Sequence, residues 1–283
     1  MPDTGWQWDP SLYAGSAPYY SAGRVPYPVE LVESVAGRLG LDGRGRALDV
    51  GCGPGSLTLQ LAPWFEHVTG VDPDPQMLAE GRRRAEAAGI SNVEWVHLKA
   101  EDLPADLGPF RLVTLAQSFH WMERAHVARL LHGLLTRDGA LAHVHATTHR
   151  GVDGISALPY PRPPRAGIDA LVGTYLGSRH RAGRGHRPTA VDQGAEDGSR
   201  EAEIYRAAGF EHLGRISVPG RVVTRTTDEV VASVFSLSYA NPQLFGDRMP
   251  AFERELRMQL LEVNPDGRFS EEMRPIDVDL WRV

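Results

Sequence analysis

The stretch that decides the fold is Arg46-Ala47-Leu48-Asp49-Val50-Gly51-Cys52-Gly53-Pro54-Gly55. An apolar run ends there in an acid, glycines then alternate, and a helical pattern follows over 56–63. This order predicts a buried parallel strand at 46–50, a tight turn, and a helix at about 55–63. Glycine has no Cβ, so the backbone can turn sharply and a ligand can approach it closely. Open α/β sheets bind ligands at the carboxyl ends of their strands, so we expect a nucleotide-like ligand at this turn.

The spacing of these glycines separates two classes of nucleotide site. The dinucleotide fingerprint places glycine at the first, third and sixth positions, whereas here the sixth is Ser56 and the additional glycine is the fifth. Preceded by Leu-Asp-Val, this spacing resembles the first motif of the class I S-adenosylmethionine (AdoMet) dependent methyltransferases. The resemblance implies that the turn holds the amino-acid part of AdoMet, through Asp49, Gly51, Cys52 and Gly53.

Bulk composition limits the classes of partner. The chain has 283 residues, 42% of them hydrophobic and 23% charged, which is ordinary for a globular protein. Its formal charge of −6 argues against a nucleic-acid partner, so we expect a small-molecule acceptor. No apolar run approaches the ~18 residues of a membrane span, and no signal-peptide pattern opens the chain. These features predict a cytoplasmic monomer or homodimer, and the single Cys52 excludes an intrachain disulfide or a cysteine-based zinc cluster.

An acid follows the second predicted strand. Residues 67–71 form a buried run that ends at Asp72, about 20 residues beyond the glycine turn, where a ribose partner is expected. A carboxylate can accept hydrogen bonds from both ribose hydroxyls. An Asp in this place can also cap a helix, a role that Asp74 is placed to take for a helix at 75–88. The resemblance adds that Pro73 and Met77 line the adenine.

The third predicted strand, 93–98, leads into Lys99-Ala100-Glu101-Asp102-Leu103-Pro104. This run resembles the family's Asp-Ala-Glu-x-Leu-Pro stretch, which reads the adenine amino group. Lys99 stands where an acid is common, so we assign adenine recognition to the Ala100 backbone and to Glu101 or Asp102. The alternative is an ordinary polar loop.

The fourth predicted strand, 110–116, leads into Gln117-Ser118-Phe119-His120-Trp121-Met122. The Phe-His-Trp triplet resembles the branch of the family that includes trans-aconitate-methyltransferase-like enzymes. The resemblance implies that Gln117 touches AdoMet and that His120 borders the transferred methyl. Because imidazole accepts protons near neutral pH, His120 is the candidate catalytic base, and Trp121 is a candidate wall of the acceptor pocket. The alternative is that His120 and Trp121 only pack and cap a helix.

Residues 1–28 are rich in aromatic residues and proline, including Trp6 and Trp8, and are expected to pack on the body of the protein. Tyr20, Arg24 and the following Pro-Tyr-Pro resemble a Tyr…Arg-x-Pro-Tyr-Pro stretch of the same branch. The resemblance implies a lid over AdoMet in which Arg24 pairs with the methionine carboxylate. A surface strap over the sheet is the alternative.

The second half of the chain is expected to complete the sheet and to add a cap. We predict a helix at 126–135, a turn at 137–139 and a fifth strand at 140–147, on which His143 and His145 share a face. These two histidines could form a metal-binding pair, but we expect them to be hydrogen-bonded core residues. No metal site is predicted. His149 lies past the strand's end and is a candidate for lining the acceptor pocket. Further elements are predicted at 167–176 (helix), 200–208 (helix), 211–218 (strand, continuing through 222–224), 228–237 (helix capped by Thr227), 250–262 (helix) and 277–283 (antiparallel strand).

The predicted fold is an α/β, Rossmann-like, seven-stranded, mostly parallel sheet with helices on both faces, a final antiparallel strand and a helical cap from two insertions. The expected parts are a lid (1–28), an AdoMet-binding core (29–150), a substrate cap (151–199) that contains a basic loop (179–187), and the end of the core (200–283) with a helical insertion (228–265). Ser236 and Tyr239 of that insertion are candidates for the acceptor pocket.

These features predict an AdoMet-dependent methyltransferase for a small organic molecule such as a specialised metabolite. In-line methyl transfer requires mainly positioning and the exclusion of water. Two alternatives stay open. One is an NAD(P)-dependent oxidoreductase, disfavoured by Ser56 and by the lack of a Tyr-x-x-x-Lys pair. The other is an AdoMet-binding module without transfer activity.

Overall fold

The computed structural model describes residues 9, 11–154, 157–177, 181–182, 185–186 and 199–283. Trp6, Trp8 and most of the predicted basic loop at 179–187 lie outside the described residues. Within the described residues, no helix combines the length and the apolar character needed to cross a membrane.

A seven-stranded sheet forms the centre of the molecule, as predicted. Its strand order is β3-β2-β1-β4-β5-β11-β8, and β11 runs antiparallel to both of its neighbours while β1 to β5 pair in parallel. The inner strands β1 and β4 are buried along most of their length because helices cover both faces of the parallel sheet. The strands are β1 (Arg46–Val50), β2 (His67–Asp72), β3 (Val93–His97), β4 (Phe110–Ala116), β5 (Leu135–His145), β8 (Glu211–Val218) and β11 (Ile276–Arg282).

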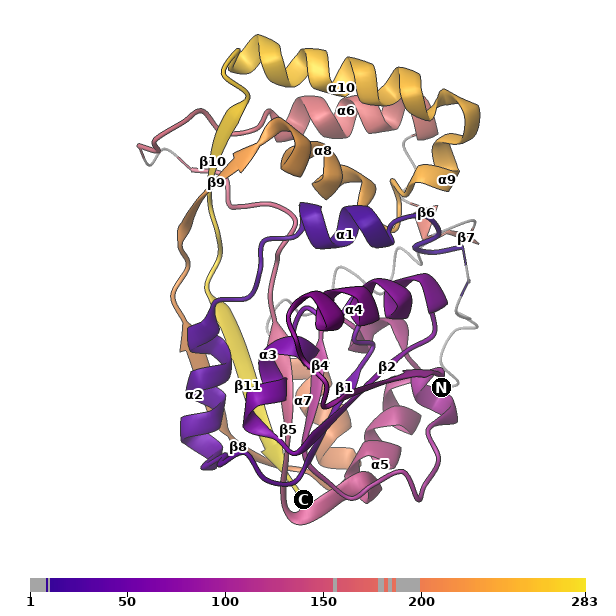
Figure 1. Cartoon of the computed structure of the whole chain (residues 1–283), viewed down its shortest axis with the longest axis vertical. Helices are drawn as coiled ribbons and strands as arrows, with labels where there is room; N and C mark the ends of the chain where they lie inside the picture. Colours follow the sequence, from indigo (N-terminus) through magenta and orange to yellow (C-terminus); the bar gives the residue numbers. More distant parts are fainter. Residues whose placement is uncertain (1–8, 10, 155–156, 178–180, 183–184, 187–198) are drawn as a thin grey trace.

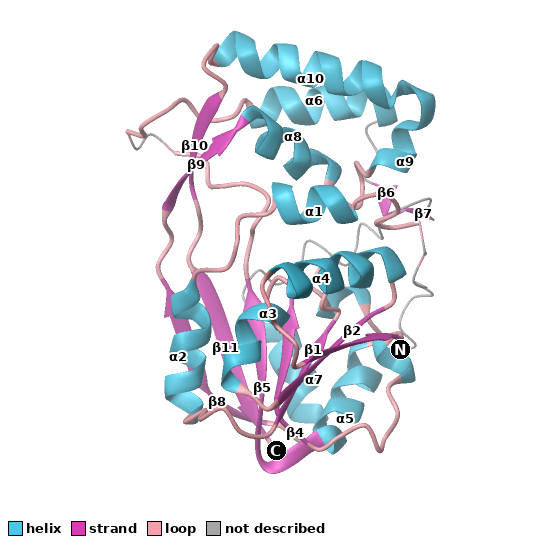
Figure 2. Cartoon of the chain, in the orientation of Figure 1, coloured by secondary structure: helices cyan, strands magenta, loops and turns pink. Residues whose placement is uncertain are grey.

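Helices pack on both faces of this sheet (Figures 1 and 2). One apolar cluster joins α2 and α3 to the strands, and a second joins α5 and α7 to the opposite face. Helix α4 packs against β3, where a Cβ on its Gly81 would lie 2.6 Å from the Trp95 ring. The bounds are α2 (Val29–Leu39), α3 (Thr58–Leu61), α4 (Pro75–Ala87), α5 (Arg124–Leu134) and α7 (Ser199–Ala207).

Several predicted boundaries differ from the structure. Helix α3 has four residues and continues as the 3-10 helix η1 (Ala62–Trp64), because the glycine turn occupies the chain up to residue 57. The predicted turn at 137–139 lies within β5, whose pairing with β4 shifts register between Phe110 and Leu112. The strand after 218 does not continue, because Pro219 has no N–H and Gly220 passes the Met273 carbonyl too closely for any Cβ. The cap of α8 is Thr226, in a capping box with Glu229, rather than Thr227.

A helical cap stands on the carboxyl-end side of the sheet. Its own apolar cluster joins four helices, and a two-stranded sheet of β9 and β10 links it to the core. Two of its elements, α9 and β10, have no counterpart in the sequence prediction. Strand β9 includes the residues predicted as strand at 222–224, but it pairs with β10 and does not extend β8. The cap elements are α6 (Arg165–Leu176), β9 (Val222–Thr226), α8 (Thr227–Phe235), α9 (Pro242–Phe245), α10 (Met249–Val263) and β10 (Arg268–Glu272), and short strands β6 (Arg181–Ala182) and β7 (Gly185–His186) pair nearby.

Helix α1 (Ala17–Gly23) is attached to this cap, and Figure 1 shows it between α8 and α4. The Ser16 hydroxyl donates to the Phe235 carbonyl at 2.9 Å, and the Asn241 amide donates to the Leu12 carbonyl at 3.0 Å. A Cβ on Gly23 would lie 2.3 Å from the backbone of Ala232. The N-terminal segment therefore packs as part of the cap and roofs the end of the sheet.

Candidate functional site

The turn after β1 accepts only glycine at two of its positions. Gly51, Gly53 and Gly55 have φ values of 68°, 54° and 74°, a left-handed region that disfavours residues with a Cβ. A Cβ on Gly51 would lie 2.4 Å from Ser118, and one on Gly55 would lie 2.3 Å from the Trp95 ring. Gly53 faces open space instead. A ligand can therefore lie directly on the backbone at Gly53.

Hydrogen bonds join this turn to β2. The N–H groups of Gly51 and Cys52 donate to the Val71 carbonyl, and the Gly53 N–H donates to a carboxylate oxygen of Asp72 at 2.8 Å. The glycine turn and the acid that follows β2 are thus one unit, although 19 residues separate Gly53 from Asp72 in the chain.

Asp72 is buried, and its two oxygens accept from the N–H groups of Gly53 and Asp74. Burial raises the pKa of its carboxyl to about 7, and the two backbone hydrogen bonds oppose that rise. Asp74 caps α4 by accepting from Gln76 and Met77. Each Asp72 oxygen keeps a lone pair free, so the carboxylate can accept two further hydroxyls.

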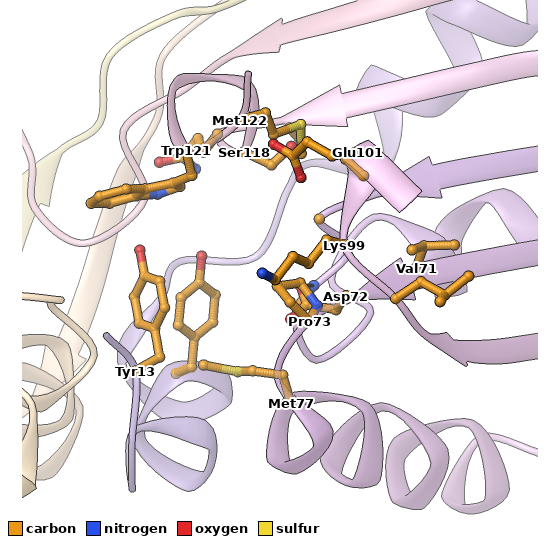
Figure 3. A pocket seen from close by; sticks show the side chains of 17 residues that line it. Tyr13, Val71, Asp72, Pro73, Met77, Lys99, Glu101, Ser118, Trp121 and Met122 are labelled. Carbon is orange, nitrogen blue, oxygen red and sulfur yellow. Dashed lines mark hydrogen bonds between the residues drawn. The ribbon is translucent and has the colours of Figure 1, made fainter. Parts of the chain in front are cut away.

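Asp72 lies in the wall of a cavity of about 680 Å³, including its open mouth, which we call the head cavity. Figure 3 shows Tyr13 and Trp121 on one side of this cavity, facing Asp72, Pro73 and Lys99 on the other. Ten predicted site residues line it: Tyr20, Gly51, Gly53, Asp72, Pro73, Met77, Ala100, Glu101, Gln117 and Trp121.

A second cavity, which we call the tail cavity, adjoins the first. The two share the walls formed by Tyr20, Gly51, Gly53 and Ala116, so they make one crevice across the glycine turn. The tail cavity brings together Arg24, Asp49 and Cys52 of the predicted set, and it is also lined by Tyr27, Gln60, Arg84 and Thr148.

Comparison with known proteins agrees with this geometry. Residues 47–139, from β1 into β5, match the family model described as methyltransferase domain. The chain therefore contains a class I methyltransferase domain. Such domains use AdoMet as their cofactor.

Relatives and solved structures extend this methyltransferase likeness. The chain is 36% identical over 131 residues to an uncharacterized methyltransferase of Mycobacterium tuberculosis, covering 44% of this chain and 49% of the relative. It is 26% identical over 127 residues to Saccharomyces cerevisiae CRG1, named a probable S-adenosylmethionine-dependent methyltransferase, covering 44% of this chain and 43% of CRG1. The matches thus span about half the length of these curated relatives.

Two solved structures show the same fold. A Bacillus halodurans protein named "putative methyltransferase" has a TM-score of 0.51 at 17% identity, covering 90% of this chain and 97% of its own. The [4+2]-cyclase SpnF has a TM-score of 0.53 at 19% identity, covering 99% and 98%. At these identities the likeness concerns the fold alone.

Two predicted cofactor-binding residues at the glycine turn of the methyltransferase domain are buried in the fold. Asp49 is fully buried and accepts from the hydroxyls of Thr58 at 2.6 Å and Thr114 at 2.7 Å, and burial raises the pKa of its carboxyl. Burial likewise raises the pKa of the Cys52 thiol well above its ordinary value, which keeps it neutral and unreactive.

Some predicted residues of the methyltransferase domain lie away from the crevice. His120 is exposed, packs its ring on Trp121 at a centroid distance of 4.7 Å, and lines neither cavity. Asp102 is also exposed and lines neither cavity, and the Glu101 carboxylate accepts from the Glu123 N–H. The structure therefore brings Trp121 to the crevice but leaves its neighbour His120 outside.

The candidate acceptor-lining residues other than Trp121 lie between the core and the cap. His149 and Tyr239 line neither cavity, and burial followed by the charge of Arg24 holds the pKa of His149 well below its ordinary value. Ser236 is buried and accepts from the Arg24 guanidinium at 2.9 Å. Ser236 is therefore joined to the tail cavity through Arg24, which lines it.

The strand-five histidines are hydrogen-bonded within the fold, and only His143 of the two is buried. His143 is buried and hydrogen-bonds the Tyr205 hydroxyl at 3.1 Å, and His145 pairs with Asp279 at 3.0 Å. No cluster of three or more His, Cys, Asp or Glu side chains in the described parts of the chain could hold a metal ion.

Several residues of the crevice have no signal in the sequence that predicts their place there. Tyr13 packs edge-on against Tyr20 and Trp121, but its segment has no periodicity that could assign it to an element. Arg84 lies on α4 and donates to the Pro54 carbonyl at 2.7 Å, a contact 30 residues apart that no local motif encodes. Tyr27 precedes α2 in the chain and Thr148 follows β5, and both line the tail cavity. A search for polar residues just past each strand end would have found Thr148.

Proposed function

We propose that this chain transfers the methyl group of AdoMet to a small organic acceptor. The observation that supports the proposal is the crevice over the glycine turn, with the Asp72 carboxylate in one cavity and Arg24 in the other. The open face of Gly53 between them fits a thin, flexible chain that joins a ribose to an amino-acid group.

The residues present fit AdoMet. Asp72 would accept from the ribose hydroxyls, and the apolar side chains of Met77, Pro73 and Leu98 would enclose the adenine in the head cavity. We keep Ala100 and Glu101 as candidates for reading the adenine edge, because both line this cavity. The exposed Asp102 is not proposed for it.

AdoMet supplies a methyl group on a sulfonium, and the transfer is an in-line displacement. The chain itself orients the cofactor and excludes water, because Tyr13, Tyr20 and Trp121 roof the head cavity. His120 lies outside both cavities, so we assign it no proton transfer.

We propose that the lid (1–28) and the two insertions at 151–199 and 228–265 enclose the acceptor. The helices of these segments stand beyond the carboxyl-end side of the sheet (Figure 1). The formal charge of −6 disfavours a nucleic acid as the acceptor. A medium-sized organic molecule fits such an enclosed, aromatic-lined space.

Methyl-labelled AdoMet, incubated with the protein and a panel of small organic acids, amines and phenols, tests this function. We expect label in one class of acceptor. Asp72→Ala should weaken AdoMet binding by about 1.5–3 kcal/mol, as for lost charged hydrogen bonds. Asp106→Ala, at an exposed acid, should leave binding unchanged.

Two results would contradict the proposal. Binding of S-adenosylhomocysteine without release of label to any acceptor would indicate a binding module. A dissociation constant that is equal for the Asp72→Ala variant and the wild type would reject the ribose assignment.

A further inference from the structure

Helix α10 of the cap keeps apolar side chains in solvent. Six large apolar side chains are exposed among the described residues, and three of them, Met258, Leu261 and Val263, lie in the last six residues of this helix. Exposed apolar residues scattered singly are ordinary, whereas a group of them on one element indicates a contact surface. Figure 1 shows α10 at the outer end of the molecule, beyond α6 and α8. The group is therefore placed to contact another molecule.

The inner face of α10 is fixed by packing. Phe252, Leu256 and Leu260 are fully buried at four-residue spacing and belong to the apolar cluster of the cap. A Cβ on Gly167 of α6 would lie 2.2 Å from the side-chain nitrogen of Gln259, so the two helices approach closely. Because this face is occupied, the rotation of α10 about its axis is set and its opposite face points to solvent.

The opposite face carries a stripe of apolar residues between two charges. Arg254, Met258 and Glu262 follow one another at four-residue spacing, and Leu261 lies beside them at a spacing of three from Met258. All four side chains are exposed. We call these four residues the outer stripe.

The two charges of the outer stripe have no ion pair within the chain. Their neighbour Arg257 pairs with Glu253 at 2.8 Å, whereas Arg254 and Glu262 form no ion pair with any described residue. Eight residues of helix separate Arg254 from Glu262 by about 12 Å, so the two cannot pair with each other. Both charges are therefore available to another molecule.

The outer stripe is complementary to itself. Residues 254 and 262 lie equally far from Met258 along the helix. When two copies of α10 pack antiparallel across a twofold axis at Met258, each Arg254 lies opposite the Glu262 of the second copy, and the two Met258 side chains meet at the axis. The same surface then supplies both halves of the contact, which favours a second copy of this chain over a partner of another kind.

We propose that the outer stripe of α10 is the interface of a homodimer in which two copies pack antiparallel across Met258. One pair of helices buries less than the roughly 1,000 Å² expected of a stable interface. We therefore expect a weak dimer with a dissociation constant of about 10–100 µM. The interface lies on the cap, away from the crevice, so it does not depend on the proposed methyl transfer.

Sedimentation equilibrium of the full chain at about 5–500 µM tests the dimer. The average mass of the wild type should rise from that of the 31.1 kDa monomer toward twice this value. Met258→Glu should remain monomeric over this range, because it places two like charges at the axis. Val29→Glu on α2 is the matched control, since Val29 is 58% exposed and Met258 is 51% exposed, and it should dimerise as the wild type does.

Charge reversal tests the antiparallel arrangement. Arg254→Glu and Glu262→Arg should each weaken the dimer about tenfold, because each replaces two attractive pairs by two repulsive ones. The variant with both reversals should return to within about twofold of the wild type. Because the two residues cannot pair within one helix, this recovery reports a contact between copies, and its failure would overturn the antiparallel arrangement.

A disulfide tests the position of the axis. Met258→Cys should form a covalent dimer when oxidised glutathione is the oxidant, because a twofold axis brings two identical Cβ atoms together. Val29→Cys should remain monomeric, and the buried Cys52 does not compete. A wild-type protein that is monomeric at the highest concentration would reject the proposal. A dimer of unchanged affinity in Met258→Glu would also reject it, since the contact would then lie on another surface.

Discussion

The protonation of one carboxyl, Asp72, links the cofactor site to pH. Burial raises its pKa to about 7, and two backbone N–H groups only partly offset that cost. Ribose hydroxyls donate to the ionised form, so cofactor affinity should increase as pH rises. At pH 6 only about a tenth of the carboxyl is ionised, which predicts a dissociation constant of S-adenosylhomocysteine roughly tenfold weaker than at pH 8.

The raised pKa of Asp72 affects the stability of the free protein in the opposite direction to cofactor affinity as pH rises. A raised pKa stabilises the fold of the free protein below the ordinary pKa of the carboxyl, and this contribution is lost as pH rises through about 7. Asp72→Asn removes the titration, so its weaker binding should show no step between pH 6 and 8. A step that persists in this variant would assign the pH dependence to another group.

His120 is the residue on which sequence and structure point in different directions. Its triplet resembles an active-site motif, yet His120 is exposed, packs on Trp121 and lines neither cavity. His120→Ala should therefore leave kcat within about twofold, because removing a group that touches no reacting atom costs little transition-state stabilisation. Steady-state kinetics with the acceptor measures this effect. A hundredfold loss of kcat at unchanged KM would instead support His120 as the catalytic base.

At the scale of elements, the contact of α1 with α8 depends on one glycine. A Cβ on Gly23 would meet the backbone of Ala232 and Ser233 at 2.3 Å, and backbone cannot move aside as a side chain can. Gly23→Ala should therefore lower the free energy of unfolding by about 1–3 kcal/mol, as for overpacking, and weaken cofactor binding because the roof shifts. Chemical denaturation measures the first effect.

Gly37 on α2 provides the matched control. It is exposed, and a Cβ at this position would have no atom within 4 Å, so Gly37→Ala should raise stability by about 0.5–1 kcal/mol. Equal effects of the two substitutions would mean that helix propensity, not the close approach of α1 and α8, controls stability at residue 23.

The sequence predicted the elements whose signal is local. Strand β1 appears at its predicted residues because an apolar run ends at the glycine turn, and Asp74 caps α4 as its position suggested. Elements fixed by distant contacts were missed. Strand β10 pairs with β9, far back in the chain, with Phe269 opposite Arg225 and Ser270 opposite Thr224. Thr226 caps α8 because its side chain, not that of Thr227, reaches the Glu229 N–H.

The site residues likewise divide into those that local sequence spacing predicts and those that distant contacts place. The glycine turn and Asp72 were predictable because spacing along the chain places them at adjacent strand ends. The remaining walls of the crevice come from side chains such as Tyr13, Tyr27 and Arg84. Their contacts depend on how the N-terminal segment and α4 pack on the core. No periodicity in their own segments marks them.

At the scale of the whole molecule, a buried ion cluster ties the cap to the core. The Glu271 carboxylate on β10 accepts from Arg165 at 2.7 Å and from Arg225 at 3.1 Å, and both arginines also donate to the His149 carbonyl. Glu271→Gln would leave two arginines without their counter-charge and should lower the free energy of unfolding by about 3–5 kcal/mol. Thermal and chemical denaturation measure this loss.

The pH dependence of the cluster follows from the same contacts. Burial raises the pKa of Glu271, but hydrogen bonding and charge from Arg165 outweigh it and leave that pKa below its ordinary value. Its contribution is therefore present above the ordinary pKa of glutamate and is lost as pH falls below it. Glu272→Gln, beside it but 3.9 Å from Arg162, is the control and should change stability by less than about 0.5 kcal/mol.

The proposed methyl transfer requires that the crevice formed by the glycine turn and Asp72 holds an AdoMet-type nucleoside. Calorimetric titration of the full chain with S-adenosylhomocysteine and, separately, with NAD tests it most directly. We expect one-to-one binding of S-adenosylhomocysteine that Asp72→Ala weakens, and no heat from NAD. Saturable NAD binding with no binding of S-adenosylhomocysteine would contradict it.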